Sequence, residues 1–146
     1  MKKFTFSLER IKQYREQVEE TEKNVLGEMR AELNALTASR EELLRIIAEK
    51  NEELRLLYQK GAFPIEISTL NRFISVKKAE LEEKRAEIRR KENEIEYQLE
   101  KVLDATREVQ KLEKLEEHQL EEYREQERKE QEHFIEEFVS NSLNKA

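Results

Sequence analysis

The chain has 146 residues, of which 42% are charged and 36% hydrophobic, and its formal net charge is −6. It contains two Gly, one Pro and no Cys, so it lacks the turn-forming residues and the apolar material of a compact globule of this length. The missing Cys excludes disulfide bonds, thiolate metal sites and thiol catalysis.

Neither a secretory signal nor a membrane-spanning run is recognisable in the sequence. The two N-terminal Lys residues are followed by no apolar stretch, and no window approaches the ~18 consecutive apolar residues of a membrane span. We therefore expect a cytosolic protein made of long helices in a thin coiled coil. Disorder, the other outcome of high charge, is disfavoured by the regular apolar spacing described next.

The first predicted helix covers about residues 7–58. Ser7 suits the N-cap position, and Phe6 with Ile11 has the spacing of a hydrophobic staple. The apolar stripe of this helix consists of Ile11, Tyr14, Val18, Val25, Met29, Leu33, Leu36, Leu43, Ile47, Leu54 and Leu57. From Val25 onward, two successive steps of four residues form a stutter, which unwinds a coiled coil locally. We expect a local straightening there, around Gly27.

A turn is predicted at residues 59–66, because Gly61 just after a periodic run and Pro64 shortly after it form the usual helix stop. Ser68 is a candidate cap for the second helix, which is predicted over about residues 67–139. Every seventh residue at the start of this helix is apolar: Ile67, Ile74, Leu81, Ile88, Ile95, Val102 and Val109. This strict repeat is typical of a left-handed coiled coil.

The two helices are expected to lie antiparallel, since a short connection favours antiparallel neighbours. Folding about residue 62 pairs positions whose numbers sum to about 124, which sets Leu43 against Leu81 and Leu36 against Ile88. The fold is therefore predicted to be all-α, a single-domain antiparallel two-helix coiled coil, or α-hairpin.

The neighbouring seam of the second helix carries Lys77, Lys84 and Lys91. Lys at a coiled-coil core position lowers stability, so a permanently tight dimer of hairpins is disfavoured and we expect a monomer.

Residues beyond Leu120 have no partner in this pairing and form a predicted helical overhang, frayed from Ser140 onward. Its charge is strongly acidic, and an apolar cluster at helical spacing lies near its end. We expect a partner or a neighbouring copy to cover this cluster. The candidate partner-binding residues of the overhang are Tyr123, Phe134, Ile135 and Phe138.

Other kinds of site find little support in the sequence. Glu130 and His133 have the Glu-x-x-His spacing of di-metal bundles, but such sites need two motifs and the chain has one, so no metal or cofactor is expected. No phosphate-binding loop or nucleophile elbow is present, and no enzyme activity is expected. The basic stretch of residues 72–91 is interrupted by Glu in an acidic chain, which argues against nucleic-acid binding.

Several segments resemble the FliJ family of the flagellar type III export apparatus. They are Phe4-x-Phe6-x-Leu8-Glu9 followed by Tyr14-Arg15, Leu26-Gly27-Glu28-Met29-Arg30, Phe73-Ile74, Leu112-Glu113-Lys114-Leu115-Glu116 with Gln119, and Glu130-Gln131 leading to Glu136.

The resemblance implies a hairpin similar to the central stalk of rotary ATPases. It implies a stalk and adaptor protein at the centre of the hexameric export ATPase, which couples this ring to the membrane-embedded export gate and escorts export chaperones. Leu43 and Phe73 match the gate-contact positions best, and the overhang is expected to engage the ATPase. The expected location is the cytoplasm, peripherally at the inner membrane at the flagellar base.

Two other functions stay open from the sequence. The first is a holdase chaperone of the prefoldin type, although residues 59–66 are too few for the β-hairpins that prefoldin subunits insert between their helices. The second is a plain structural spacer, which would tolerate scrambling of the overhang.

Overall fold

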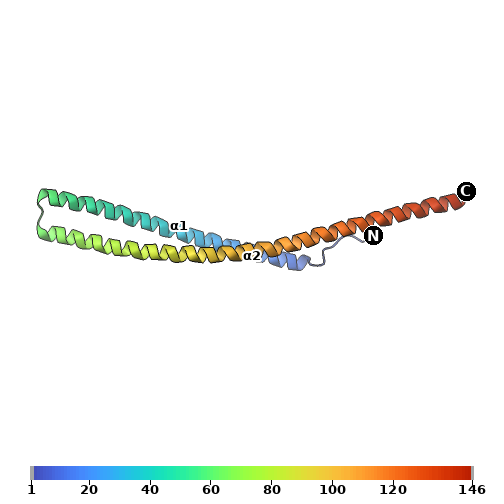
Figure 1. Ribbon diagram of the computed structural model, residues 1–146, viewed down its shortest axis with the longest axis horizontal. Coiled ribbons are helices and arrows are strands. Elements are labelled where there is room, and N and C mark those ends of the chain that lie inside the picture. Colours follow the sequence, from blue (N-terminus) through green and yellow to red (C-terminus); the bar gives the residue numbers. More distant parts are fainter. Residues whose placement is uncertain (1, 146) are drawn as a thin grey trace. The chain divides into compact units, whose positions relative to one another are not determined.

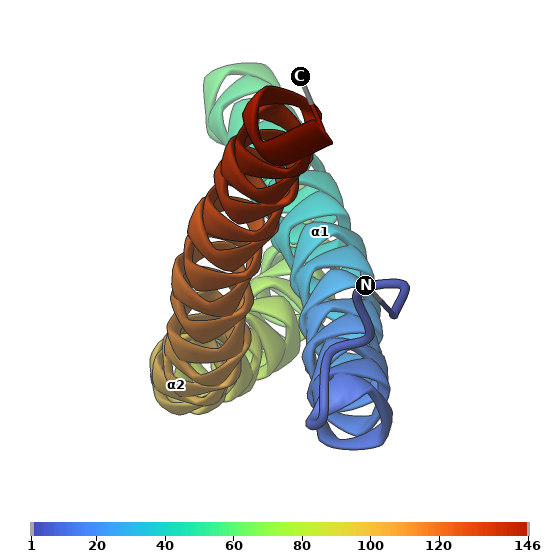
Figure 2. The ribbon, with the colours of Figure 1, turned by 90° about the vertical axis from the view of Figure 1, so that its right-hand side faces the viewer.

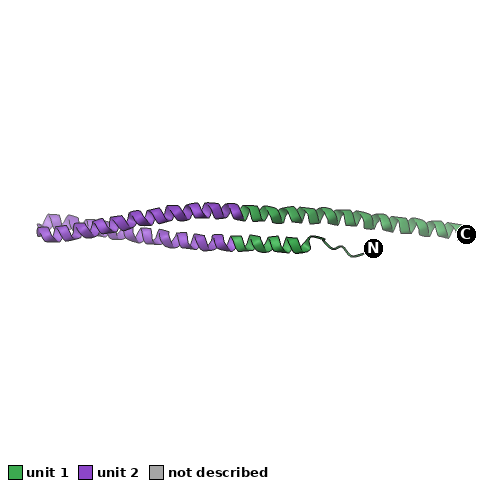
Figure 3. Ribbon diagram, turned by 90° about the horizontal axis from the view of Figure 1, so that it is seen from below, with its two compact units in different colours: residues 1–22, 102–146 green, residues 23–101 purple. Residues whose placement is uncertain are grey.

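The computed structural model describes residues 2–145, and its regular structure consists of two helices. Helix α1 runs from Glu9 to Lys60 and helix α2 from Pro64 to Lys145 (Figure 1). The chain divides into two compact units (Figure 3). We call Lys23–Lys101 the hairpin unit, and the described residues of Met1–Glu22 and Val102–Ala146 the terminal unit. The all-α prediction is confirmed.

The turn of the hairpin unit spans residues 61–63 and is shorter than the predicted 59–66. Gly61 has a φ of 73°, which is a left-handed backbone conformation. This conformation is unfavourable for residues that have a Cβ atom, but not for Gly. The Ala62 N–H donates to the Leu57 carbonyl at 3.2 Å, which is the six-to-one hydrogen bond of a Schellman motif. This motif ends α1 at Lys60, and the chain then reverses direction.

Helix α2 begins at Pro64, three residues earlier than predicted. The Phe63 carbonyl accepts hydrogen bonds from Glu66 N at 3.0 Å and from Ile67 N at 3.3 Å, so Phe63 takes the N-cap place that we had predicted for Ser68. Pro suits the first helical position because its missing N–H would have no partner there. At the other end α2 continues to Lys145, since no Gly or Pro follows Pro64 to stop it. The predicted helix end at residue 139 is therefore too early, while the fraying from Ser140 stays a prediction.

Helix α1 begins at Glu9, two residues later than predicted. The Phe6 carbonyl accepts from Glu9 N at 3.2 Å in a turn, and the Leu8 carbonyl accepts the first helical bond, from Lys12 N at 2.9 Å. Leu8 rather than Ser7 is thus the last residue before the helix. Phe6 is buried within the terminal unit, and the non-helical segment that carries it leads into α1 (Figure 2).

The hairpin unit is held together by the predicted seven-residue stripe of α2. Ile74, Leu81 and Ile88 of this stripe are buried. On α1 the buried and half-buried seam positions alternate in steps of three and four without interruption: Leu26, Met29, Leu33, Leu36, Arg40, Leu43, Ile47, Lys50, Leu54 and Leu57. A continuous heptad therefore replaces the predicted stutter, because Leu26, 6% exposed, occupies the seam in place of Val25.

Two contacts between the helices fix the register of the hairpin unit. Lys50 Nζ lies 5.6 Å from the centre of the Phe73 ring, and Lys91 Nζ lies 2.5 Å from a carboxylate oxygen of Glu32. Both pairs of residue numbers sum to 123, one residue from the predicted value of 124. The antiparallel pairing is thereby confirmed.

In the terminal unit the first part of the α2 seam, from Val102 to Leu112, is apolar, whereas the α1 seam is charged. Val102, Ala105 and Val109 of α2 are buried. The α1 positions that continue the heptad are half-buried and charged: Lys12, Arg15, Glu19 and Glu22. The predicted core residues Ile11 and Tyr14 are instead 48% and 61% exposed, so the prediction of an apolar seam was wrong here.

Candidate partner-binding surfaces

The last part of α2 presents an apolar surface that is open to solvent. All side chains of residues 128–145, which we call the C-terminal segment, are exposed. Among them Phe134, Ile135 and Phe138 are 70%, 60% and 65% exposed, and Leu143 is 72% exposed. Exposed aromatic and aliphatic side chains gathered on a few helical turns are typical of interaction sites.

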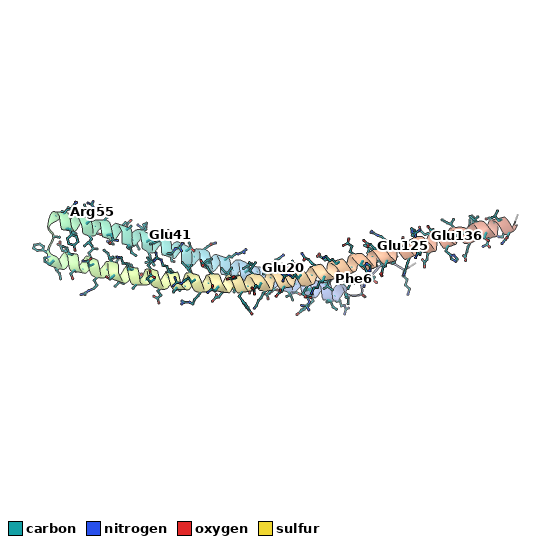
Figure 4. The ribbon with its side chains drawn as sticks, viewed as in Figure 1. Phe6, Glu20, Glu41, Arg55, Glu125 and Glu136 are labelled. Carbon is teal, nitrogen blue, oxygen red and sulfur yellow. The ribbon has the colours of Figure 1, made fainter. Side chains whose placement is uncertain are left out.

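Polar side chains one helical turn apart pair with each other in this part of α2 and support the helix. Arg128 bridges Glu125 and Glu132 one turn to either side, and His133 Nε2 lies 3.2 Å from Glu137. The Arg128 guanidinium lowers the pKa of the Glu125 carboxyl, chiefly through its hydrogen bond. The side chains of Glu125 and Glu136 project from α2 (Figure 4). The resulting surface combines exposed Phe side chains with negative charge.

Tyr123 is not part of this open surface, although the sequence placed it there. It is half-buried, its ring centre lies 5.5 Å from that of Phe4 at an angle of 54°, and its hydroxyl donates to the Lys2 carbonyl. Burial, followed by the negative charge of Glu127, raises the pKa of the phenol. The N-terminal segment thus pairs with α2 beyond Leu120, and the unpaired helix begins later than predicted.

The sequence resemblance predicted Leu43 and Phe73 as gate-contact positions. Of these two, Phe73 is exposed, and it lies near the turn of the hairpin unit. It is 40% exposed and lies between two cations, Lys50 Nζ at 5.6 Å and Lys77 Nζ at 5.4 Å from its ring centre. A surface hollow extends from Phe73 to Leu57 and Ile65. Leu43 is different, because it is a half-buried seam position.

A further apolar surface was not recognised from the sequence. The sequence pattern predicted Ile11, Tyr14 and Val18 as core residues, but Ile11 and Tyr14 are exposed and Val18 is half-buried. Tyr14 and Val18 line a shallow hollow on α1 in the terminal unit. Their spacing of three and four residues is equally compatible with a core and with an exposed stripe. The two cases are distinguished by extending the steps of three and four residues backward from Leu26, which leads to Lys12 and Arg15 rather than to Ile11 and Tyr14.

Residues 2–145 offer no group of three or more His, Cys, Asp or Glu side chains that could hold a metal ion. Within the same residues, no helix is long and apolar enough to cross a membrane.

The fold defines an all-α protein of the helical-hairpin class with exposed apolar side chains on its helices. The profile of the FliJ family, described as flagellar FliJ protein, matches residues 4–145. The chain therefore belongs to the FliJ family, and membership identifies it as a component of the flagellar export apparatus. Neither a curated protein nor a solved structure matches the chain.

Proposed function

We propose that the chain is a non-enzymatic stalk and adaptor of flagellar protein export. In this proposal it promotes the function of the hexameric export ATPase and couples the ATPase to the cytoplasmic part of the membrane export gate. It also escorts export chaperones, and it resides in the cytoplasm, peripherally associated with the inner membrane at the flagellar base. Membership in the FliJ family supports the part of this proposal that assigns the chain to flagellar protein export.

The observation that carries the ATPase assignment is the exposure of the C-terminal segment. Phe134 and Phe138 lie one helical turn apart, both are more than 60% exposed, and the segment is already helical. A preformed helix with aromatic anchors is suited to a groove on a partner, since little conformational entropy is lost on binding. The surrounding Glu residues favour a partner surface of positive charge.

The gate assignment rests on Phe73 near the turn. An aromatic ring between two Lys side chains presents apolar area together with positive charge, which suits an apolar and acidic peptide of the gate protein. Leu43 is a half-buried seam residue and is not itself a contact in our proposal. A prefoldin-like chaperone receives no support, because the helices are joined by residues 61–63 alone.

Size-exclusion chromatography of the chain with the export ATPase tests the first assignment. We expect co-elution with the full chain and loss of co-elution when the chain is truncated after Glu127, a position that leaves the Tyr123 contacts intact. The point variant Phe134→Ala should weaken binding at least tenfold, whereas Tyr97→Ala, which removes a 63% exposed aromatic residue of the hairpin unit, should not. Binding that survives truncation would refute the assignment.

The gate contact is tested in the same way with the cytoplasmic part of the gate protein. Phe73→Ala should reduce binding, and Val76→Ala is the matched control, because Val76 lies on the same helix and is 51% exposed. Equal effects of the two variants would argue against a specific role of Phe73.

A further inference from the structure

The first part of α1 carries two parallel stripes that could each face α2. The stripe that faces α2 in the structure contains Lys12, Arg15 and Glu19, all half-buried. The second stripe lies one residue earlier in each case and contains Ile11, Tyr14 and Val18. Both stripes have the spacing of three and four residues that a coiled-coil seam requires. A rotation of α1 by one residue, about 100°, therefore exchanges them.

The stripe in use matches α2 at Lys12, which pairs with the half-buried Glu116, but the same unit also buries an apolar part of the α2 seam. Buried apolar residues of α2, Val102 and Val109, belong to the same unit as the charged α1 stripe. The ion pair from Lys12 Nζ to Glu116, 2.7 Å long, holds the charged stripe in place, and the hydrogen bond raises the pKa of Lys12. Most of the apolar stripe remains in solvent, with Ile11 48% and Tyr14 61% exposed, while Val18 is half-buried. One exchange would place apolar residues against apolar residues and charges in water.

Gly27 provides a place where α1 can absorb such a rotation. With Val18, Val25 and Met29 as seam residues, the heptad acquires a step of four next to another step of four, which is a local change of supercoil twist. Gly27 lies within that stretch, and a Cβ added there would meet no described heavy atom within 4 Å. Packing therefore does not require Gly at this position, while Gly lowers the resistance of a helix to local untwisting.

We propose that residues 9–22 of α1 are a two-state element, which packs on α2 either through the charged stripe of Lys12, Arg15 and Glu19 or through the apolar stripe of Ile11, Tyr14 and Val18. The first state exposes an apolar surface and the second exposes a charged one. Any partner that prefers one surface shifts the balance between the states. This proposal does not depend on the identity of the ATPase or gate partner.

Cysteine pairs in the full-length chain can test the exchange, because the chain has no Cys of its own. All three variants carry Glu116→Cys. The second cysteine is Lys12→Cys for the charged state or Ile11→Cys for the apolar state. The matched control is Gln13→Cys. Gln13 lies about 100° from Lys12 around the helix, as Ile11 does but in the other direction, and it faces α2 in neither state. Intramolecular disulfide formation by diamide is followed at low protein concentration on non-reducing gels.

We expect the Lys12 pair to close first and the Ile11 pair to close at least tenfold faster than the Gln13 pair. Gly27→Ala should slow closure of the Ile11 pair several-fold and leave the Lys12 pair unchanged. The proposal is overturned when the Ile11 pair closes no faster than the Gln13 pair, since both then report the same undirected fluctuation. An unchanged rate in Gly27→Ala removes Gly27 from the mechanism.

Discussion

Replacing Gly by Ala is expected to change the free energy of unfolding in opposite directions at the two glycines of the chain. Gly27 lies inside α1 with ordinary helical geometry, whereas Gly61 ends the helix with a φ of 73°. A Cβ added at either position meets no described heavy atom within 4 Å. Steric contacts are therefore equal, and the difference between the two Ala variants isolates the backbone.

Gly27→Ala should stabilise the hairpin by about 1 kcal/mol, the difference between the two residues in a helix interior. Gly61→Ala should destabilise it by about 1–2 kcal/mol, because a Cβ disfavours the left-handed conformation. With a urea dependence of about 2 kcal/mol/M, the unfolding midpoints shift by about +0.5 M and by about −0.5 to −1 M.

Urea unfolding followed by circular dichroism at 222 nm measures both shifts, and hydrogen exchange of residues 57–63 localises the effect of Gly61→Ala to the turn. A midpoint that rises in Gly61→Ala would refute the argument from its left-handed conformation, and a midpoint that falls in Gly27→Ala would refute the argument from helix propensity. Gly61→Asn is a control, since Asn tolerates the left-handed region better than Ala and should recover part of the loss.

Three further results are expected. Leu26→Ala should destabilise the hairpin by about 2–4 kcal/mol in urea unfolding and Val25→Ala by less than half as much, because Leu26 fills the seam; the reverse order would restore the predicted stutter. Since the pKa of Lys12 is raised above its usual 10.5, its ion pair contributes fully below that pH and is lost at higher pH. Helicity at 222 nm should therefore fall more between pH 10 and 12 in the native chain than in Lys12→Met, and equal curves would contradict the pairing. The phenol of Tyr123 should titrate above its usual pKa of 10.0, and Phe4→Ala should lower this pKa by uncovering the ring, as measured by NMR of Cζ-labelled tyrosine; an unchanged value would exclude Phe4 as its cover.

The sequence is sufficient to predict the hairpin, because Ile74, Leu81 and Ile88 form a strict repeat and Gly61 marks the turn. The same reasoning failed for the start of α1. Apolar spacing alone selects Ile11 as a core residue, but in the structure the seam of α1 continues in steps of three and four residues without a stutter. The phase of this seam is set by the residues from Leu26 onward, and it turns the charged residues inward.

The sequence predicts the exposure of the apolar cluster near the end of α2 but not the position at which the unpaired part of the helix begins. Phe134 and Phe138 are exposed as expected, because the pairing partner ends before them. Tyr123 is covered by a non-helical segment, and contacts such as the hydroxyl with the Lys2 carbonyl have no periodic signature in the sequence. Backbone acceptors are identical at every residue, so only coordinates identify which of them a side chain uses.

The exposure of residues 128–145 has a consequence for the thermodynamics of binding. An isolated polar helix of this length is marginal in water because nucleation is unfavourable, but here α2 continues into the segment and the nucleus already exists. A tail that folds on contact loses about 1–2 kcal/mol of backbone entropy for every residue that it orders. Association through this segment should therefore show a heat-capacity change that matches the apolar area of its Phe side chains, without the larger change that accompanies coupled folding.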